Sequence, residues 1–372
     1  MFVAHSGDGY GANRSLFDIL FGLDKALFEP VLVAGSSGFL TQEVAKKDIP
    51  VYVMPFRRWT RIKFYSPVML NWVANFLTAC RMAFLARSLG VVLIYTNTGG
   101  VVSGALAARL AGIKHIWHVR EEVSERPFEF KIIDRLSDQI IANSQATRKR
   151  FADQAQKKIA VVYNGFRVPP GIADKDREDS KGKLGLSGQN VLTLIGSIDE
   201  RKGQKESVLA MPQILKHCPN TKLIFVGQSL PSTKSYETEV KRMISSLGIQ
   251  QSVLFYGFKE NLDEVYSLTD IQIVPSRYEA FGRVIVEGML RGLPVIATNT
   301  GGIPEIIQDQ KTGILIDVRE PEVLAEAVIE LFGNGNKRHQ ISQAARLSAI
   351  NSFGMDNTIN SIQKHIEETI SH

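Results

Sequence analysis

The chain has 372 residues, which is too long for one ordinary hydrophobic core and favours two domains. Its 44% apolar and 22% charged residues are typical of a soluble globular protein, and it contains no run of about 18 apolar residues that could cross a membrane. The net charge of +6 suits anionic ligands or an anionic membrane face. It is too dispersed for a nucleic-acid surface, and no recognition-helix or aromatic RNA-binding motif is present.

The two cysteines, Cys80 and Cys218, lie in opposite halves of the chain. Such isolated cysteines argue against a disulfide framework and are expected in a reducing cytoplasm. No signal peptide is recognisable, and the chain opens directly on the strand-like residues 1–4, so a residue or two of the usual first strand is expected to be missing.

Short apolar runs alternate with helix-length amphipathic stretches along the chain, which predicts βαβ units, parallel sheets and two doubly wound domains. The expected strands are 2–5, 31–34, 51–54, 91–97, 115–119, 139–142 and 160–163, followed by 190–195, 222–226, 253–256, 271–274, 294–297 and 314–317. The expected domains are residues 1–168 and 189–350, with a polar linker at 169–188 and a final helix within 351–372.

The first expected strand leads into residues 6–15, Ser-Gly-Asp-Gly-Tyr-Gly-Ala-Asn-Arg-Ser. Alternating glycines let a backbone turn approach a ligand closely, although the spacing is not that of the dinucleotide-binding GxGxxG motif. Gly9 and Gly11 are therefore candidate ligand contacts. Asn13 and Arg14 either reach the same ligand or lie on the surface of the following helix.

Two further segments of the first half carry side chains that could contact a membrane or a ligand. Residues 56–65, Phe-Arg-Arg-Trp-Thr-Arg-Ile-Lys-Phe-Tyr, suit a membrane interface, or else form a solvated loop with packed aromatic rings. His118 falls near the carboxyl end of an expected strand, where parallel sheets bind ligands. It is a candidate ligand contact or an ordinary buried histidine, and Arg120 and Glu121 beside it are weaker candidates.

The second half begins with a strand and a glycine turn, after which Arg201 and Lys202 precede a helix. Arginine can bind two phosphate oxygens at once, whereas lysine supplies a point charge. Fixed cations of this kind stabilise the charge that develops on a departing diphosphate. The alternative is a solvated turn in which Glu200 is the ion partner.

The most informative segment is 275–288, Pro-Ser-Arg-Tyr-Glu-Ala-Phe-Gly-Arg-Val-Ile-Val-Glu-Gly. Glu279 follows a buried strand, and Gly282 permits a close approach at a helix start whose N–H groups suit a phosphate. Glu287 falls about one turn into that helix among apolar residues, where a carboxylate is costly unless it is paired. A sugar hydroxyl is a natural partner; the alternative is a capped helix with one surface and one salt-bridged glutamate.

This segment resembles the E-x7-E signature of retaining glycosyltransferases of family 4, which have the GT-B fold. The resemblance extends over essentially the whole chain, with weaker motifs in the first half. It implies an α/β protein of two facing Rossmann-like domains with a central cleft. The N-terminal domain is then the acceptor half, the C-terminal domain the nucleotide-sugar half, and the final helix crosses back onto the N-terminal domain.

The resemblance also implies roles for individual residues. His118 and Glu279 contact the transferred sugar, Glu287 binds the ribose, and Arg201 and Lys202 bind the donor diphosphate. Further donor contacts fall at Gly9, Gly11, Phe281, Gly282, Arg283 and Val284. Residues 301–305, Gly-Gly-Ile-Pro-Glu, resemble a late turn near the donor, or form a plain turn before a helix. No metal ion and no cofactor is implied.

The expected function is retaining transfer of a sugar from a UDP- or GDP-linked donor to a glycan or polyprenyl-linked acceptor, as in bacterial surface polysaccharide biosynthesis. The expected location is cytoplasmic, with peripheral contact at the inner face of the cytoplasmic membrane. Three alternatives stay open: a sugar-nucleotide epimerase of GT-B shape, a phosphorylase-like enzyme, and a non-catalytic partner subunit. A phosphorylase needs a pyridoxal-binding lysine, for which the sequence offers no convincing context.

Overall fold

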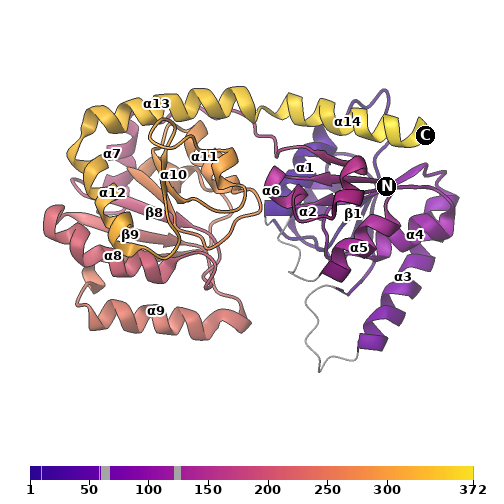
Figure 1. The fold of residues 1–372 in the computed structure, drawn as a ribbon, viewed down its shortest axis with the longest axis horizontal. Coiled ribbons are helices and arrows are strands. Elements are labelled where there is room, and N and C mark those ends of the chain that lie inside the picture. The colour runs from indigo at the N-terminus through magenta and orange to yellow at the C-terminus, as the bar shows by residue number, and fades with distance from the viewer. Residues whose placement is uncertain (10, 58, 60–67, 121–126, 372) are drawn as a thin grey trace. The chain divides into compact units, whose positions relative to one another are not determined.

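A computed structural model describes residues 1–9, 11–57, 59, 68–120 and 127–371. The chain forms two compact units. Unit 1 comprises Met1–Phe166 and Phe353–His372, and unit 2 comprises Arg167–Ser352 (Figure 1). Each unit holds one sheet in which all pairings between neighbouring strands are parallel, so the predicted pair of doubly wound α/β domains is confirmed.

Unit 1 contains a seven-stranded sheet in the order β3-β2-β1-β4-β5-β6-β7. Its strands are β1 (Phe2–Ala4), β2 (Leu32–Ala34), β3 (Val51–Val53), β4 (Leu93–Thr96), β5 (Lys114–Val119), β6 (Gln139–Ala142) and β7 (Ile159–Val161). Its helices are α1 (Gly11–Gly22), α2 (Phe39–Ala45), α3 (Val68–Ser88), α4 (Ser103–Ala111), α5 (Pro127–Leu136), α6 (Gln145–Arg148) and α14 (Met355–Ser371).

The last helix of the chain packs against the first helix in unit 1 (Figure 1). Ile362 and Ile366 of α14 belong to the same buried cluster as Leu16 and Ile19 of α1. Gly22 marks how close the helices come, because a Cβ atom there would lie 1.7 Å from a side-chain carbon of Ile359. The core of unit 1 therefore depends on residues from both ends of the sequence.

Unit 2 contains a six-stranded sheet in the order β10-β9-β8-β11-β12-β13. Its strands are β8 (Asn190–Ile195), β9 (Thr221–Val226), β10 (Val253–Gly257), β11 (Ile271–Val274), β12 (Val295–Thr298) and β13 (Ile314–Ile316). Its helices are α7 (Asp174–Lys183), α8 (Gln204–His217), α9 (Lys234–Ser246), α10 (Asp263–Leu268), α11 (Arg283–Leu290), α12 (Pro321–Gly333) and α13 (Gly335–Ser352).

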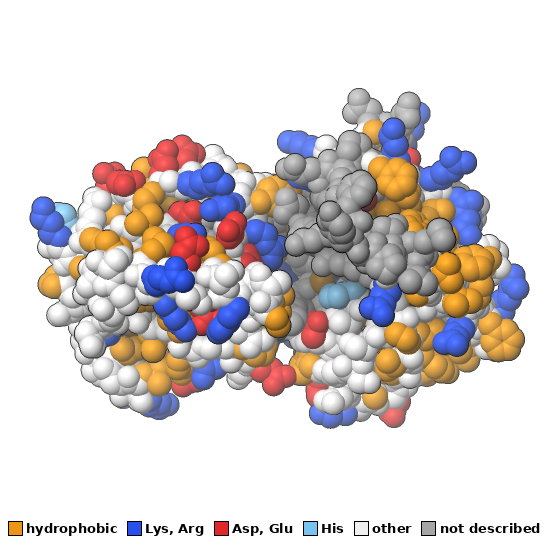
Figure 2. Space-filling view, turned by 90° about the horizontal axis from the view of Figure 1, so that it is seen from below, with side chains coloured by type: hydrophobic (Ala, Val, Ile, Leu, Met, Phe, Trp, Pro, Cys, Tyr) orange, Lys and Arg blue, Asp and Glu red, His pale blue; other side chains and the backbone are white. Residues whose placement is uncertain are grey.

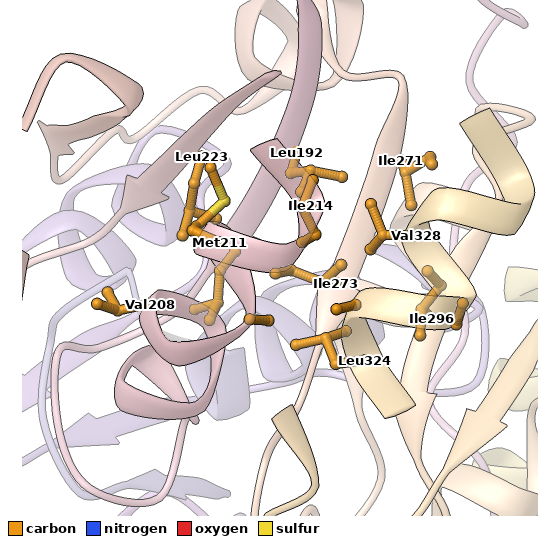
Figure 3. Packing of buried hydrophobic residues seen from close by; sticks show 14 of the residues in the cluster. Leu192, Val208, Met211, Ile214, Leu223, Ile271, Ile273, Ile296, Leu324 and Val328 are labelled. Atoms are coloured by element: carbon orange, nitrogen blue, oxygen red, sulfur yellow. The ribbon is translucent and has the colours of Figure 1, made fainter. Parts of the chain in front are cut away.

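The core of unit 2 lies between the sheet and the helices α8 and α12 (Figure 3). Leu192 and Ile273 come from neighbouring central strands, whereas Met211 and Leu324 come from the two helices. The strands read as continuous apolar runs because a parallel sheet covered by helices buries both of its faces. This packing fixes the strand ends from which the loops of the candidate site emerge.

Residues 169–188, whose polar composition suggests a linker, carry helix α7. The helix is anchored in unit 2 because the ammonium of Lys181 lies 2.7 Å from the carboxylate of Asp270, next to β11. That carboxylate also accepts a hydrogen bond from the amide of Val191 at 2.7 Å, and Lys181 is buried. The polar composition thus reflects a surface helix held by an ion pair.

No helix among the described residues is both long enough and apolar enough to cross a membrane. Of the basic-aromatic segment 56–65, the structure describes only Phe56, Arg57 and Trp59. Trp59 is buried, and its indole N–H donates to the carbonyl of Gly99 at 3.0 Å. The rest of that segment, together with Tyr10 and Glu121, lies outside the described residues.

Shortening a buried side chain of α14 should destabilise unit 1. We expect Ile362→Ala to lower its free energy of unfolding by about 2–5 kcal/mol, because the change leaves a cavity in a closed core. The three tryptophans, Trp59, Trp72 and Trp117, all belong to unit 1, so denaturation followed by tryptophan fluorescence reports on this unit. Leu347→Ala, at an exposed position on α13 of unit 2, is the control. An unchanged midpoint for Ile362→Ala would contradict the packing of α14 in the core.

Candidate functional site

Two loops at the carboxyl edge of the unit 2 sheet meet through an ion pair. The loop after β8 carries Lys202, and the loop after β11 carries Glu279. The Nζ atom of Lys202 lies 2.6 Å from Oε1 of Glu279, and the hydroxyl of Ser276 donates to the same oxygen at 2.9 Å. Both charged side chains are largely buried, so each limits the desolvation cost of the other.

Glycines let the backbones of three loops touch at this edge. Gly203 has φ 78°, and a Cβ atom there would lie 2.2 Å from the carbonyl oxygen of Pro275. Gly301, after β12, has φ 56°, and a Cβ atom there would lie 2.0 Å from the carbonyl oxygen of Glu279. The amide of Gly302 donates to that same carbonyl at 2.8 Å. The Gly301-Gly302 turn therefore holds the loop that carries Glu279.

Arg201 is held by a carboxylate in its own loop. Its Nε and Nη2 atoms donate to Asp199 at 3.1 and 2.9 Å, and the hydroxyl of Ser197 donates to Asp199 at 2.6 Å. Burial raises the pKa of Asp199, but the hydrogen bonds from Arg201 and Ser197 outweigh burial, so that its pKa is lowered. Asp199 therefore stays ionised and orients a guanidinium whose side chain remains 53% exposed.

Glu287 lies on α11. The apolar residues beside it in the sequence suggest an apolar setting, but in the structure its carboxylate has polar partners. The hydroxyl of Tyr266 donates to its Oε2 at 2.9 Å, and the guanidinium of Arg283 lies 3.4 Å from its Oε1, one turn earlier on the helix. Arg291 stacks on the ring of Tyr266 at 4.4 Å. The carboxylate is thus held in one orientation at the edge of the sheet.

The start of α11 brings its backbone to the same edge. Gly282, the residue before the helix, has φ 106°, which a side chain would make costly. The N-terminal end of a helix attracts anions because its first amides lack carbonyl partners within the helix. Phe281 is buried, so its side chain packs inside unit 2 and only its backbone can meet a ligand.

In unit 1, Asn13 and Arg14 shape the glycine loop after β1. The Nδ2 atom of Asn13 donates to the carbonyls of Ser6 and Asp8, both at 3.1 Å, and Nε of Arg14 donates to the carbonyl of Gly9 at 2.9 Å. Asn13 is buried. Through these contacts Asn13 and Arg14 support the loop, and the burial of Asn13 excludes a place on the exposed surface of α1.

His118 is buried at the end of β5. Its Nδ1 atom is hydrogen-bonded to the hydroxyl of Tyr95, and its Nε2 atom, also buried, has no hydrogen-bond partner among the described residues. Burial lowers the pKa of His118 well below its ordinary value, and the positive charge of Arg120 lowers it further. The imidazole is therefore neutral near pH 7, with one nitrogen fixed by Tyr95.

Arg120 connects the carboxyl ends of several strands. Its Nε atom donates to Asn97, which follows β4, at 2.7 Å, and its Nη1 atom donates to Asn164, which follows β7. Its own carbonyl accepts from Asn143, after β6, at 2.8 Å. The side chain is buried. These contacts give Arg120 a structural part in unit 1.

Four supporting residues do not emerge from reasoning about the motifs. Ser276 and Asp199 stand only two or three positions from the residues that they hold, so their spacing is a usable signal. Tyr266 and Tyr95 stand 21 and 23 positions from their partners, and no local pattern connects them. Within the described ranges, no group of three or more His, Cys, Asp or Glu residues could hold a metal ion.

Comparisons with known proteins give one consistent result. The profile described as "Glycosyltransferase Family 4" matches residues 10–168, and that described as "Glycosyl transferases group 1" matches residues 176–348. Spore coat protein SA of Bacillus subtilis is 28% identical over 56% of this chain and 58% of its own length. A GDP-mannose-dependent alpha-(1-6)-phosphatidylinositol monomannoside mannosyltransferase of Mycolicibacterium smegmatis is 28% identical over 58% of this chain and 59% of its own length.

The chain thus spans less than two thirds of these curated relatives. HepE of Anabaena, solved with UDP, with UDP and glucose, and with UDP-glucose, is similar over at least 98% of both chains. In the UDP complex it has a TM-score of 0.84 and 25% identity over 99% of each chain. The expected GT-B fold is therefore confirmed.

The buried histidines of β5 should make unit 1 sensitive to acid. Burial lowers the pKa of His115 to about 3, so the unfolded chain binds a proton below about pH 6.5 that the folded chain does not. The contribution of the neutral histidine to the free energy of unfolding is then fully present above pH 6.5. It is lost as the pH falls, by about 1.4 kcal/mol per pH unit for each such histidine.

Denaturation followed by tryptophan fluorescence between pH 7 and pH 4 measures this slope. His115→Gln should flatten it, whereas His217→Gln, at an exposed position on α8 of unit 2, should leave it unchanged. A slope that stays the same in His115→Gln would contradict the assignment.

Proposed function

Since this chain belongs to the glycosyl transferases group 1, glycosyltransferase family 4, we propose that it transfers a sugar from a nucleotide-sugar donor bound by unit 2. The observation that carries the proposal is the contact of Lys202 with Glu279, which joins a cation and a carboxylate 77 positions apart at the carboxyl edge of a parallel sheet. Ligands of doubly wound sheets bind at this edge.

The proposed donor is a UDP-sugar. HepE, which is similar over the whole length of this chain, was solved with UDP and with UDP-glucose. The mycobacterial relative is GDP-mannose-dependent by its name, but it matches over a shorter part of this chain. Support therefore favours UDP over GDP.

Each residue of the site has a proposed role toward that donor. Lys202 and Arg201 stabilise the negative charge on the departing diphosphate, aided by the helix start at Gly282. Glu279 orients the transferred sugar, and Glu287 accepts hydrogen bonds from the ribose hydroxyls. The neutral His118 of unit 1, together with the glycine loop at Gly9 and Gly11, remains a proposed sugar and phosphate contact.

The ion pair of Lys202 and Glu279 suits a site that must accept a dianion. Lys202 offers a compact charge with three N–H donors, one of which serves Glu279. The other N–H donors of Lys202 can bind an incoming diphosphate, so no further cation has to be buried at the site. Asp199 holds Arg201 in a similar way, and about half of the Arg201 side chain remains exposed to meet a ligand.

We propose a glycan or lipid-linked acceptor and a location at the inner face of a membrane, as in surface polysaccharide assembly. The name of the mycobacterial relative specifies a phosphatidylinositol-linked acceptor, which supports a lipid acceptor within this group. The positive net charge of +6 suits an anionic membrane face.

Donor binding is the first test. We expect calorimetry to detect UDP binding, and Glu287→Ala to weaken it by about 10- to 100-fold, because charge-assisted hydrogen bonds contribute about 1.5–3 kcal/mol. Glu326→Ala, an exposed position on α12, is the matched control and should bind as the wild type does. Tighter binding of GDP would reverse the choice of base, and no binding of either nucleotide by the folded protein would favour a non-catalytic partner subunit.

Removing the lysine should affect the chemical step more than the fold. We expect Lys202→Ala to lower the rate of UDP release from UDP-glucose, measured with a lipid extract as acceptor, by about 100- to 1000-fold. Lys205→Ala is the matched control, because Lys205 is equally exposed and is ion-paired with Glu239 at 2.5 Å. Equal turnover by a folded Lys202→Ala variant would remove Lys202 from the mechanism.

The proposed reaction retains the anomeric configuration of the sugar. The bond between the anomeric carbon and the diphosphate breaks first in a dissociative step. The acceptor oxygen then bonds to the anomeric carbon from the same face, and its proton passes to the departing diphosphate. NMR of the product should therefore show the same anomeric configuration as the donor. An inverted product would refute this mechanism while leaving the donor site intact.

A further inference from the structure

Helix α3 is apolar on two opposite sides. Its inner side contributes Ala79, Met82, Ala83 and Ala86 to the core of unit 1. Its outer side carries four large apolar residues between 50% and 76% exposed, which are Val73, Phe76, Leu77 and Phe84. Cys80 is exposed between them. At about 100° per residue, these five positions fall within roughly 100° of arc, so they form one continuous stripe, here called the α3 stripe.

Such a stripe is unusual on a protein that stays free in water. Scattered exposed apolar side chains are normal, but a continuous row on one helix marks an interaction surface. Three of the four large residues lie within one helical turn of one another, and Phe84 follows two turns after Phe76. The unit 1 core does not need this side, because the inner side of the helix already closes it.

The stretch of sequence that contains α3 carries charges of one sign. Between Asp48 and Glu121 the sequence contains nine Lys and Arg residues and no Asp or Glu, although the whole chain has a net charge of only +6. The remainder is therefore net negative, by −3. Arg81 and Arg87 lie on α3 itself, and α4, which packs against it, adds Arg109. The right-hand part of Figure 2, which is unit 1, shows hydrophobic and basic side chains gathered together.

This combination selects among the surfaces that could cover the α3 stripe. Phenylalanine and leucine beside arginine suit the headgroup region of a bilayer, where the rings enter the acyl boundary and the cations meet anionic lipids. A second copy of the chain would place two basic stripes against each other, with no carboxylate on α3 or α4 to pair with Arg81 or Arg87. Charge therefore disfavours self-association and favours an anionic lipid surface.

We propose that the outer face of α3 docks onto an anionic phospholipid bilayer, with Phe76, Leu77 and Phe84 entering the interface and Arg81 meeting the headgroups. The helix lies on the membrane and does not cross it. The proposal rests on the proposed membrane location but not on the donor chemistry. The residues that it places at the bilayer lie on α3 and not in the basic-aromatic segment 56–65.

The chain supplies its own reporter for this contact. Cys80 lies within the α3 stripe, whereas Cys218 of unit 2 is half-buried and burial raises the pKa of its thiol. In a Cys218→Ala background, a polarity-sensitive fluorophore attached to Cys80 should shift its emission to the blue when vesicles of phosphatidylcholine and phosphatidylglycerol are added. Pure phosphatidylcholine vesicles, or high salt, should weaken the shift.

Substitutions without the label test the same face. The double variant Phe76→Ser/Phe84→Ser should lower binding to the anionic vesicles by about tenfold or more, because both rings are lost from the buried apolar area. Arg81→Glu should lower it at low salt. Leu347→Ser, an equally apolar and exposed position on α13 of unit 2, is the matched control and should bind normally. UDP binding in solution should be unchanged in all three variants.

Three outcomes would overturn the proposal. They are the absence of wild-type binding to anionic vesicles, equal binding by the double variant, and a blue shift that depends on protein concentration without vesicles. The last outcome would assign the α3 stripe to a second copy of the chain. Loss of UDP binding in the wild type would instead refute the proposed donor site, so the two failures remain distinguishable.

Discussion

The candidate site depends on one steric constraint, the direct contact of three backbones at the carboxyl edge of the unit 2 sheet. The loops after β8, β11 and β12 approach so closely that a Cβ atom at Gly203 or Gly301 would overlap a carbonyl oxygen of the β11 loop. Only with glycine at both positions can the loop that carries Glu279 lie between its neighbours. The ion pair with Lys202 follows, because the alkyl chain of Lys202 reaches Glu279 only from a loop that is already in contact.

Each charged group of the site is held by another polar group before any ligand arrives. Ser276 and Lys202 hold Glu279, Tyr266 and Arg283 hold Glu287, and Asp199 holds Arg201. Such support reduces the rearrangement that ligand binding requires. In unit 1 the same principle applies to neutral partners: asparagine side chains hold Arg120, and a tyrosine hydroxyl holds His118.

Local sequence patterns are sufficient for the elements but not for their arrangement. The apolar runs at 190–195 and 271–274 predict strands that coincide with β8 and β11. The order β10-β9-β8-β11-β12-β13 follows from no such pattern, because every strand of a covered parallel sheet is apolar on both faces. At 169–188 composition alone does not reveal helix α7, because a charged surface helix and a linker have similar residues; the contact of Lys181 with Asp270 anchors this helix in unit 2.

The sequence by itself determined the two α/β halves, the residue types suited to a diphosphate and a sugar, and their places at the ends of strands. These features depend on spacing within about 20 residues, which periodicity and glycine turns encode. Tertiary structure decided that Lys202 meets Glu279, that Tyr266 holds Glu287, that α14 completes the core of unit 1, and that the apolar outer side of α3 faces solvent. Such pairings depend on which strands become neighbours and on which face of each helix packs against the sheet. Interactions between residues near one another in the sequence determine neither.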